Sequence, residues 1–342
     1  MSVRPGEPAA HLGGLVATGL REVTDDLAAL DAGGRWAVAI PYAGTPVLAR
    51  FDSWSPGTPT DIAGAWRGPH EWRSSLEGPA YVDAVEFVRD RIAEGEVYQA
   101  NVCRVMEATL PDPDAMDIGG LHALLCDGNP APFAGVLRLP GDDVHIASAS
   151  PEFFLRRGGD VLESGPIKGT GRTPDDLSSK DEAENVMIVD LVRNDLSRVC
   201  ANGTVTVPSL LAVEPHPGLV HLVSTVRGRL RPAVGWPEIL DATFPPGSVT
   251  GAPKLAALGI IDEVEAAPRE YYCGAFGWVD ADAGTAELAV AIRTFWRSGN
   301  RLRFGTGAGI TWGSDACAEW EETELKAARL IRVAAGTWGV DD

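Results

Sequence analysis

The chain has 342 residues, of which 45% are hydrophobic and 23% are charged, a globular composition long enough for one large domain or two closely joined ones. The formal net charge is −19 and no cluster of Lys or Arg occurs, which argues against a nucleic acid or an anionic membrane surface as partner. No apolar stretch approaches the roughly 20 residues that span a bilayer, and the N-terminus lacks the apolar core of a signal peptide, so we expect a cytoplasmic protein.

The five cysteines are scattered along the chain, and no two of them form a Cys-x-x-Cys pair. Their odd number and wide spacing argue against a disulfide framework and against a structural zinc site. We expect buried or unreactive thiols.

Residues 1–75 contain short apolar runs separated by Gly and Pro. The runs at 36–42 and 46–51 predict strands, the stretch 54–77 is rich in turn residues, and 20–31 has helix potential. No Pro/Ser-rich linker separates this part from the rest. We therefore expect an N-terminal, strand-rich segment, 1–75, interleaved with a main catalytic domain, 76–342.

Amphipathic periodicity predicts a helix at 81–93 that ends before Gly95, followed by a strand at 97–108. From residue 133 onward the pattern is one of paired strands. Two hairpins are predicted, 153–157 with 161–164 and 287–297 with 301–306, and helical patterns occur at 180–198, 254–266 and 315–335. Hairpins with inserted helices predict an α+β fold with large antiparallel sheets.

Lys168 lies between a stiff Pro-Ile pair and a glycine, Gly169, so its amine is held rather than free. If the first hairpin has a three-residue loop, Glu152 lies opposite Pro166 and Lys168 is its diagonal neighbour on the same face. A two-residue turn would shift the register by one residue, and the two side chains would then no longer be predicted on the same face. The pair is either a simple ion pair or an acid and a nucleophile with shifted pKa values. Taken alone, a loop lysine is more often a solvated surface charge.

Glu319, Glu322 and Lys326 have spacings of three and four, which place them on one face of the C-terminal helix. Glu184 opens the apolar helix that includes 185–198. Carboxylates from these two helices could hold Mg²⁺, although a solvated Glu–Lys pair is the simpler interpretation.

Three further features are candidates for binding an anion. Thr250 is positioned to cap the helix that starts near Lys254, and the amides of such a terminus favour anions. If Arg297 pairs with Arg301, Arg293 faces Gly305 in the glycine-rich run 305–309, where a guanidinium beside bare backbone suits a carboxylate. His221, on a strand-like run, is either a packed core histidine or part of the site.

Taken together and in this order, the motifs resemble those of the chorismate-utilising enzymes. The matching stretches cover about residues 80–332: Tyr-Gln-Ala-Asn at 98–101, Ser-Pro-Glu-Phe-Phe at 150–154, Pro-Ile-Lys-Gly-Thr at 166–170, the run from Lys to Asp at 180–195, His-Leu-Val-Ser at 221–224, Gly-Ser-Val-Thr-Gly-Ala-Pro-Lys at 247–254, Ala-Ile-Arg-Thr at 291–294, Gly-Ala-Gly-Ile at 307–310 and Glu-x-x-Glu-x-x-x-Lys at 319–326. The resemblance implies two large antiparallel sheets packed as a sandwich with helices outside.

Two positions select the branch of this superfamily. Members that add water carry a lysine where this chain has Gln99, and anthranilate synthases typically have alanine where it has Lys168. The chain is therefore most similar to aminodeoxychorismate synthase component I, and the resemblance implies that Lys168 attacks C2 of chorismate.

The resemblance also implies roles for the other candidates. Glu152 would protonate the departing C4 hydroxyl as a general acid, and Arg293 would grip the enolpyruvyl carboxylate. Mg²⁺ would bind the ring carboxylate. The metal and substrate sites are assembled from two sets of residues: Glu184, Glu322 and Glu319 for Mg²⁺, and Gly307, Gly309, Lys326, Thr250, His221 and Gly169 around the substrate.

Ammonia is expected from a separate glutamine amidotransferase subunit, because no Gly-x-Cys-x-Gly nucleophile motif occurs in these 342 residues. The product would be 4-amino-4-deoxychorismate. The alternatives are an anthranilate or aminodeoxyisochorismate synthase, in which ammonia attacks C2 directly, and a catalytically silent homologue that binds chorismate or a partner.

Overall fold

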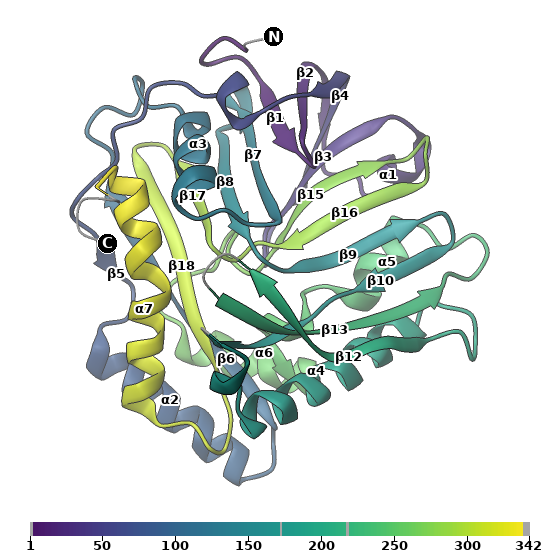
Figure 1. The fold of residues 1–342 in the computed structure, drawn as a ribbon, viewed down its shortest axis with the longest axis vertical. Coiled ribbons are helices and arrows are strands. Elements are labelled where there is room, and N and C mark those ends of the chain that lie inside the picture. The colour runs from purple at the N-terminus through teal and green to yellow at the C-terminus, as the bar shows by residue number, and fades with distance from the viewer. Residues whose placement is uncertain (1–2, 172, 217–218, 338–342) are drawn as a thin grey trace.

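The computed structural model describes residues 3–171, 173–216 and 219–337, which form an α+β fold of 18 strands and seven α-helices (Figure 1). The α+β class expected from the sequence is confirmed. All pairings between the strands are antiparallel. No helix in these three ranges is long and apolar enough to cross a membrane.

The strands form one continuous hydrogen-bonded path, which joins the sheets expected from the sequence. In order along this path they are β12 (Thr206–His216), β13 (Leu219–Arg229), β10 (Val161–Ser164), β9 (Phe153–Gly158), β16 (Thr285–Val290), β15 (Ala275–Asp280), β3 (Arg35–Ile40), β4 (Val47–Pro56), β2 (Leu15–Thr24), β1 (Ala9–Leu12), β7 (Phe133–Leu139), β8 (Val144–Ser150), β17 (Thr294–Ser298), β18 (Arg301–Ile310) and β6 (Gln99–Thr109).

Short strands complete the two ends of the path. At one end β11 (Ile167–Gly171) pairs with β13, beside β10. At the other end β14 (Gly251–Ala252) and β5 (Arg73–Ser74) both pair with the outer edge of β6. The N-terminal strands belong to the same path, since β1 pairs with β7 and β3 pairs with β15.

The helices cover the sheet in two groups (Figure 1). At the end of the path formed by β6 and β18, α7 (Ala316–Ala335) packs on β18, with α2 (Gly78–Ala93) and α3 (Ile118–Gly128) beside it. At the other end α4 (Ser179–Ser197) packs on β13 and β11, and α5 (Trp236–Thr243) lies against α4. Helix α6 (Lys254–Val264) packs on β6.

Large apolar side chains fill the space between the strands and under the helices. Trp36, Trp236 and Trp296 are almost fully buried in one core cluster, and Phe295 and Phe304 stack in a second one beneath α3 and α7. Burial of each such side chain stabilises the fold by about 1.5–3 kcal/mol. The ends of the strand path are thereby held in fixed positions relative to each other.

Most long elements predicted from the sequence are confirmed, and one is wrong. The strands predicted at 36–42 and 46–51 are β3 and β4, and the helices predicted at 81–93, 180–198, 254–266 and 315–335 are α2, α4, α6 and α7. The helix potential at 20–31 was misleading, because residues 15–24 form β2, which pairs with both β1 and β4. Only the short helix α1 (Ala29–Ala32) follows it.

Both hairpins form, but the predicted registers are wrong by one residue. Gly158 pairs with Val161, and Ser298 pairs with Arg301, so each hairpin has a two-residue turn. Glycine occupies the first turn position in both, with φ of 62° at Gly159 and 55° at Gly299, a conformation that glycine adopts without steric cost. The expected opposition of Glu152 to Pro166 and of Arg293 to Gly305 is therefore lost.

Candidate active site

Lys168 lies in a β-bulge on β11. Ile167 pairs with Val223 of β13 and Thr170 pairs with His221, so three steps along β11 match two steps along β13. Gly169, inside the bulge, has a φ of +87°, and a methyl group on it would lie 2.8 Å from Asp181 Cβ at the start of α4. Bulges commonly re-aim a side chain next to a functional site, and this one removes Lys168 from the regular ladder.

Glu152 lies in the connection between β8 and β9. Its carbonyl oxygen accepts a hydrogen bond from Val290 N–H at 3.0 Å, and its own N–H donates to Ser150 Oγ at 3.3 Å. Glu152 is only 4% exposed and lines one small cavity with Ser248, and both Ser248 and the Ile167 N–H lie close enough to its carboxyl to lower the pKa.

The pKa values of Glu152 and Lys168 are shifted towards each other. Burial raises the pKa of Glu152 to about 7, against the opposing effects of Ser248, Lys168 and the Ile167 N–H. Burial lowers the pKa of Lys168, although the carboxylates of Glu184 and Glu152 oppose the shift. A carboxyl group that retains its proton near neutral pH and an amine that loses its proton more easily are what an acid and a nucleophile require.

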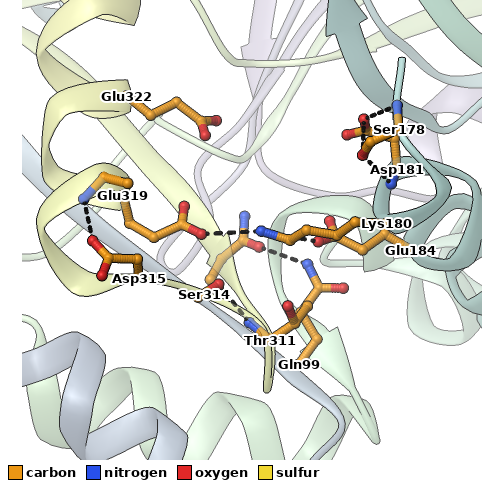
Figure 2. A network of polar contacts seen from close by, with 12 residues as sticks. Gln99, Ser178, Lys180, Asp181, Glu184, Thr311, Ser314, Asp315, Glu319 and Glu322 are labelled. Atoms are coloured by element: carbon orange, nitrogen blue, oxygen red, sulfur yellow. Dashed lines mark hydrogen bonds and ion pairs between the residues drawn. The ribbon is translucent and has the colours of Figure 1, made fainter. Parts of the chain in front are cut away.

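Acidic side chains from α4 and α7 point toward each other (Figure 2). The Lys180 ammonium lies between them, 3.3 Å from Glu319 Oε1 and 3.8 Å from Glu184 Oε1. Glu319 is 5% exposed. Burial raises the pKa of Glu184, which Lys168 and Lys180 partly offset. Two carboxylates on different helices therefore share one cation.

This arrangement fits a divalent cation in part. Within the described ranges, no three His, Cys, Asp or Glu side chains gather closely enough to form a complete protein cage. Mg²⁺ needs only one or two carboxylates, with water or substrate as the other ligands. The Lys180 ammonium already places one positive charge between Glu184 and Glu319. Glu322 is turned to Lys326 instead, at 2.6 Å.

The glycine-rich strand β18 brings the second end of the strand path to Lys168. A methyl group on Gly309 would lie 3.2 Å from Lys168 Nζ and 2.3 Å from Gln99 Nε2. Two residues earlier on the same strand, the carbonyl oxygen of Gly307 accepts a hydrogen bond from Lys326 Nζ at 3.1 Å. Gly305, by contrast, packs under the ring of Tyr272 and does not face the site.

Arg293 is a cation that forms no ion pair with any residue in the described parts of the chain. It lies between β16 and β17 with a φ of 52°, a strained conformation for a non-glycine residue. Its carbonyl oxygen accepts a hydrogen bond from Ala149 N–H, three residues before Glu152. Burial lowers the pKa of Arg293, as expected of a guanidinium that is partly enclosed by protein.

The prediction that Thr250 caps a helix is wrong. Thr250 Oγ1 donates to the carbonyl oxygens of Pro246 and Gly247, and α6 begins after Pro253. The side chain of Thr250 is fully buried, and its carbonyl oxygen accepts from Asn101 N–H at 2.8 Å. His221 is buried in β13, beside Thr170 of β11.

Sequence reasoning missed two residues of the site. Ser248 was noted only as part of a motif, and Lys180 only as the start of a helix. The signal for Ser248 is its place in a turn, directly after two prolines and a glycine. Serine is common in such turns, so this signal does not single it out. Its position beside Glu152 becomes evident only in the folded chain.

Known proteins resemble this chain in sequence and in fold. A family model described as chorismate binding enzyme matches residues 49–332. Aminodeoxychorismate synthase component 1 of Escherichia coli (strain K12) is 36% identical over 274 residues, covering 77% of this chain and 59% of the relative. Anthranilate synthase component 1 1 of Haloarcula marismortui is 39% identical over 272 residues, covering 76% of this chain and 54% of the relative. The chain thus spans a little over half the length of these two relatives.

Two solved structures share the fold. Anthranilate synthase component I from Streptococcus pneumoniae superposes with a TM-score of 0.77 at 24% identity, covering 97% of this chain and 91% of its own. The menaquinone-specific isochorismate synthase MenF from Escherichia coli superposes with a TM-score of 0.78 at 21% identity, covering 97% and 89%. The fold implied by the sequence motifs is therefore confirmed.

Proposed function

The chain belongs to the chorismate binding enzymes, and from this premise we propose that it acts as aminodeoxychorismate synthase component I, which converts chorismate and ammonia to 4-amino-4-deoxychorismate. Several curated relatives carry that name, among them those of Escherichia coli and Klebsiella aerogenes. The observation that carries the proposal is that Lys168 and Glu152 are enclosed close enough to interact electrostatically, with pKa values shifted towards each other.

In the proposed reaction the Lys168 amine adds to C2 of chorismate. The ring double bonds shift, and the C4 hydroxyl leaves as water with the proton that Glu152 has held. Ammonia then adds at C4 and displaces Lys168 from C2, which restores the free amine. Glu152 suits the first step because its raised pKa keeps a proton on the carboxyl near neutral pH.

The cations of the site suit a substrate with two carboxylates. Arg293, which has no ion-pair partner in the described ranges, would bind the enolpyruvyl carboxylate. Lys326 and the backbone beside Gly307 and Gly309 would bind on the ring carboxylate side. The absence of side chains on β18 leaves room for the ring against Lys168, and Thr250 and His221 would line the remaining wall.

Mg²⁺ is the proposed cofactor, held by Glu184 and Glu319, with Glu322 recruited from its pair with Lys326. When bound, the ion would neutralise negative charge on the substrate carboxylate. The supporting observation is that Glu184 and Glu319 already share a cation, the Lys180 ammonium. Oxygen-only ligands of this kind favour Mg²⁺ over softer metals.

The proposed source of ammonia is a separate glutamine amidotransferase subunit. The designation component 1 of several relatives is consistent with a second component. The relatives from Streptomyces, of which this chain covers 37% and 39%, are each a longer protein. Free ammonia at high pH should replace the partner in an assay.

The test is a product analysis with chorismate, Mg²⁺ and ammonium chloride at about pH 8.5, where free ammonia is available. We expect 4-amino-4-deoxychorismate from the wild-type chain, no such product from Lys168→Ala, and a mass increase on the peptide that contains residue 168 when the reaction is quenched early. Wild-type product formation by Lys168→Ala would remove Lys168 from the mechanism. No turnover despite chorismate binding would favour a silent homologue.

A second candidate function is anthranilate synthesis, which the 39% identity to the Haloarcula marismortui enzyme favours. In that reaction ammonia attacks C2 directly and Lys168 takes no part. Release of pyruvate and anthranilate by the wild-type chain in the same assay would establish this alternative, and aminodeoxyisochorismate as the final product would indicate its non-eliminating variant.

A further inference from the structure

The outer edge of β6 has a gap between its two short partner strands. β14 pairs with Gln99 and Ala100, and β5 pairs with Met106 and Glu107. Between them the carbonyl oxygen of Asn101 and the N–H of Cys103 point away from β18 without a partner strand. Buried backbone groups of this kind must find another hydrogen-bond partner.

A buried ion pair fills this gap. Cys103 N–H donates to Glu265 Oε1 at 2.8 Å, and Arg269 Nη2 donates to Asn101 O at 3.1 Å. Arg269 and Glu265 also bind each other through two bonds, Nε to Oε2 at 2.9 Å and Nη2 to Oε1 at 2.6 Å. Their side chains are 1% and 7% exposed. The Glu265 carboxylate and the Arg269 guanidinium thus form the hydrogen bonds to β6 that a neighbouring strand would otherwise form.

The same guanidinium reaches the turn that contacts the proposed acid. Arg269 Nη1 donates to Val249 O at 2.7 Å. Val249 ends the short 3₁₀ helix η4 (Gly247–Val249), and its neighbour Ser248 lines the same small cavity as Glu152. The ring of Tyr42 covers the guanidinium at 4.4 Å. The position of Ser248 is therefore tied to the frame of β6.

The pair stabilises the fold through the backbone groups that it satisfies, and it also fixes a distance near the site. Removing two charges from water is costly, and an apolar pair of similar volume is often as stable. An apolar pair would, however, leave Cys103 N–H, Asn101 O and Val249 O without partners. What the ion pair provides is a fixed distance between β6, which carries Gln99 beside Lys168, and the turn that carries Ser248.

The geometry points to Glu265 and Arg269 as positioning residues of the reaction, which hold the turn 247–249 so that Ser248 stays beside the Glu152 carboxyl. The inference rests on the proposed function, because that function assigns Glu152 the role of general acid. The effect of Ser248 on the pKa of Glu152 can be measured without turnover, so the two claims fail separately.

The readout is the pKa of Glu152. The groups that face this carboxyl are Ser248 from η4, the Ile167 N–H and Lys168 from β11, and Asp195 from α4 across a small cavity that both carboxyls line. Replacing Arg269 alters none of these groups directly. Because Ser248 beside the carboxyl lowers the pKa of Glu152, moving or removing the Ser248 hydroxyl should raise that pKa.

The experiment is a ¹³C NMR titration of carboxyl-labelled glutamate in the whole chain, with Glu152→Gln to assign the signal. We expect Arg269→Lys and Ser248→Ala each to raise the pKa of Glu152 by about 0.5–1 unit. The double variant should show no further rise. In the turnover assay, the loss of kcat at alkaline pH should move to higher pH by the same amount.

Arg303→Lys is the matched control. Arg303 also binds two carboxylates, Glu107 Oε2 at 2.8 Å and Glu270 Oε1 at 2.6 Å, but it is partly exposed and does not contact the turn 247–249. We expect this variant to leave the pKa of Glu152 unchanged.

A folded Arg269→Lys variant with the wild-type pKa of Glu152 would overturn the inference, as would additive shifts in the double variant. Glu265→Gln, which keeps the shape of the side chain, serves as a second variant. If both variants lose the fold, the pair is structural only and the inference is rejected. If the wild-type chain does not turn over chorismate, the proposed function fails while the titration still decides this inference.

Discussion

At the scale of single residues, burial determines the properties of Glu152 and Lys168. A glutamate or lysine in water has a pKa far from neutrality, and the enclosed site moves the two values towards each other. Their mutual attraction opposes these shifts, so burial outweighs it at both residues. Sequence reasoning identified both residues but had no means to calculate their burial, because the atoms that exclude water come from segments that are distant in the chain.

The raised pKa of Glu152 makes the stability of the protein depend on pH. In the unfolded chain the carboxyl has its ordinary pKa near 4.5, and in the folded chain the pKa is about 7. The protonated carboxyl therefore favours the folded state below pH 4.5, and this contribution is lost as the pH rises through 7. We expect a loss of about 3 kcal/mol between pH 4.5 and pH 8 from this group.

Urea unfolding of the wild type and of Glu152→Gln at several pH values measures this effect. The glutamine does not titrate, so the free energy of unfolding of the variant relative to the wild type should rise with pH over the same window. Parallel pH profiles of the two proteins would show that the pKa of Glu152 is not raised. Turnover by Glu152→Gln should fall by roughly 10²–10⁴-fold, the usual contribution of a general acid.

At the scale of elements, the bulge in β11 and the short turns of the hairpins decide where the site residues point. The sequence predicted the hairpins correctly because glycine clusters between β-rich runs are strong turn signals. It predicted their registers wrongly, because Gly-Gly-Asp and Ser-Gly-Asn fit turns of two or three residues equally well. The error in register did not change the position of Glu152 relative to Lys168. The strand ends before Gly165-Pro166, and the bulge in β11 then sets the direction of the Lys168 side chain.

Substitution of Gly169 by alanine tests the role of the bulge. Positive φ alone costs about 1 kcal/mol or more for alanine, and the new methyl would also meet Asp181 Cβ at 2.8 Å. We expect Gly169→Ala to lose most chorismate turnover, because relief of this contact must move either Lys168 or the start of α4, which carries Glu184.

Gly203→Ala is the control for backbone strain. Gly203 has a similar φ of +76°, is exposed, and has no atom within 4 Å of the position of a methyl group. It should lower Tm through strain alone and leave kcat and KM unchanged. Equal effects of the two substitutions on turnover would exclude a positioning role for the bulge.

Helix α3 shows why some elements were missed in the sequence. Its first turn contains Gly119 and Gly120, which disfavour a helix by about 1 kcal/mol each. A methyl on either would lie within 2.4 Å of a backbone carbonyl oxygen, of Ile62 or of Gly64. The glycines are needed because another segment crosses the helix closely, and local propensity does not contain that information.

At the scale of the whole molecule, the site lies where the two ends of one long strand path meet. Lys168 comes from the β11–β13 end and Gly309 from the β18–β6 end. The facing acidic residues follow the same division, since Glu184 belongs to α4 and Glu319 to α7 (Figures 1 and 2). A ligand bound by both groups would therefore tie the two ends of the fold together.

This arrangement predicts that Mg²⁺ stabilises the protein against heat. A ligand that binds only the folded state adds about 2.7 kcal/mol at 100 times its Kd, so Tm should rise with MgCl₂. Glu184→Gln should abolish most of the rise. Glu321→Gln, on the exposed side of α7, removes the same charge outside the site and should leave the rise intact. A rise that persists in Glu184→Gln would place the ion elsewhere.

The sequence by itself determined the α+β class, most long elements, the family resemblance and the identity of the candidate residues, because periodicity, turn residues and short motifs are local properties of the chain. Only the tertiary structure decided the strand register, the bulge at Lys168, the contact of Ser248 with Glu152 and the ion pair that completes the edge of β6. The physical reason is that these depend on which distant segments approach one another and exclude water. A single sequence does not record those approaches, whereas the packed core fixes them.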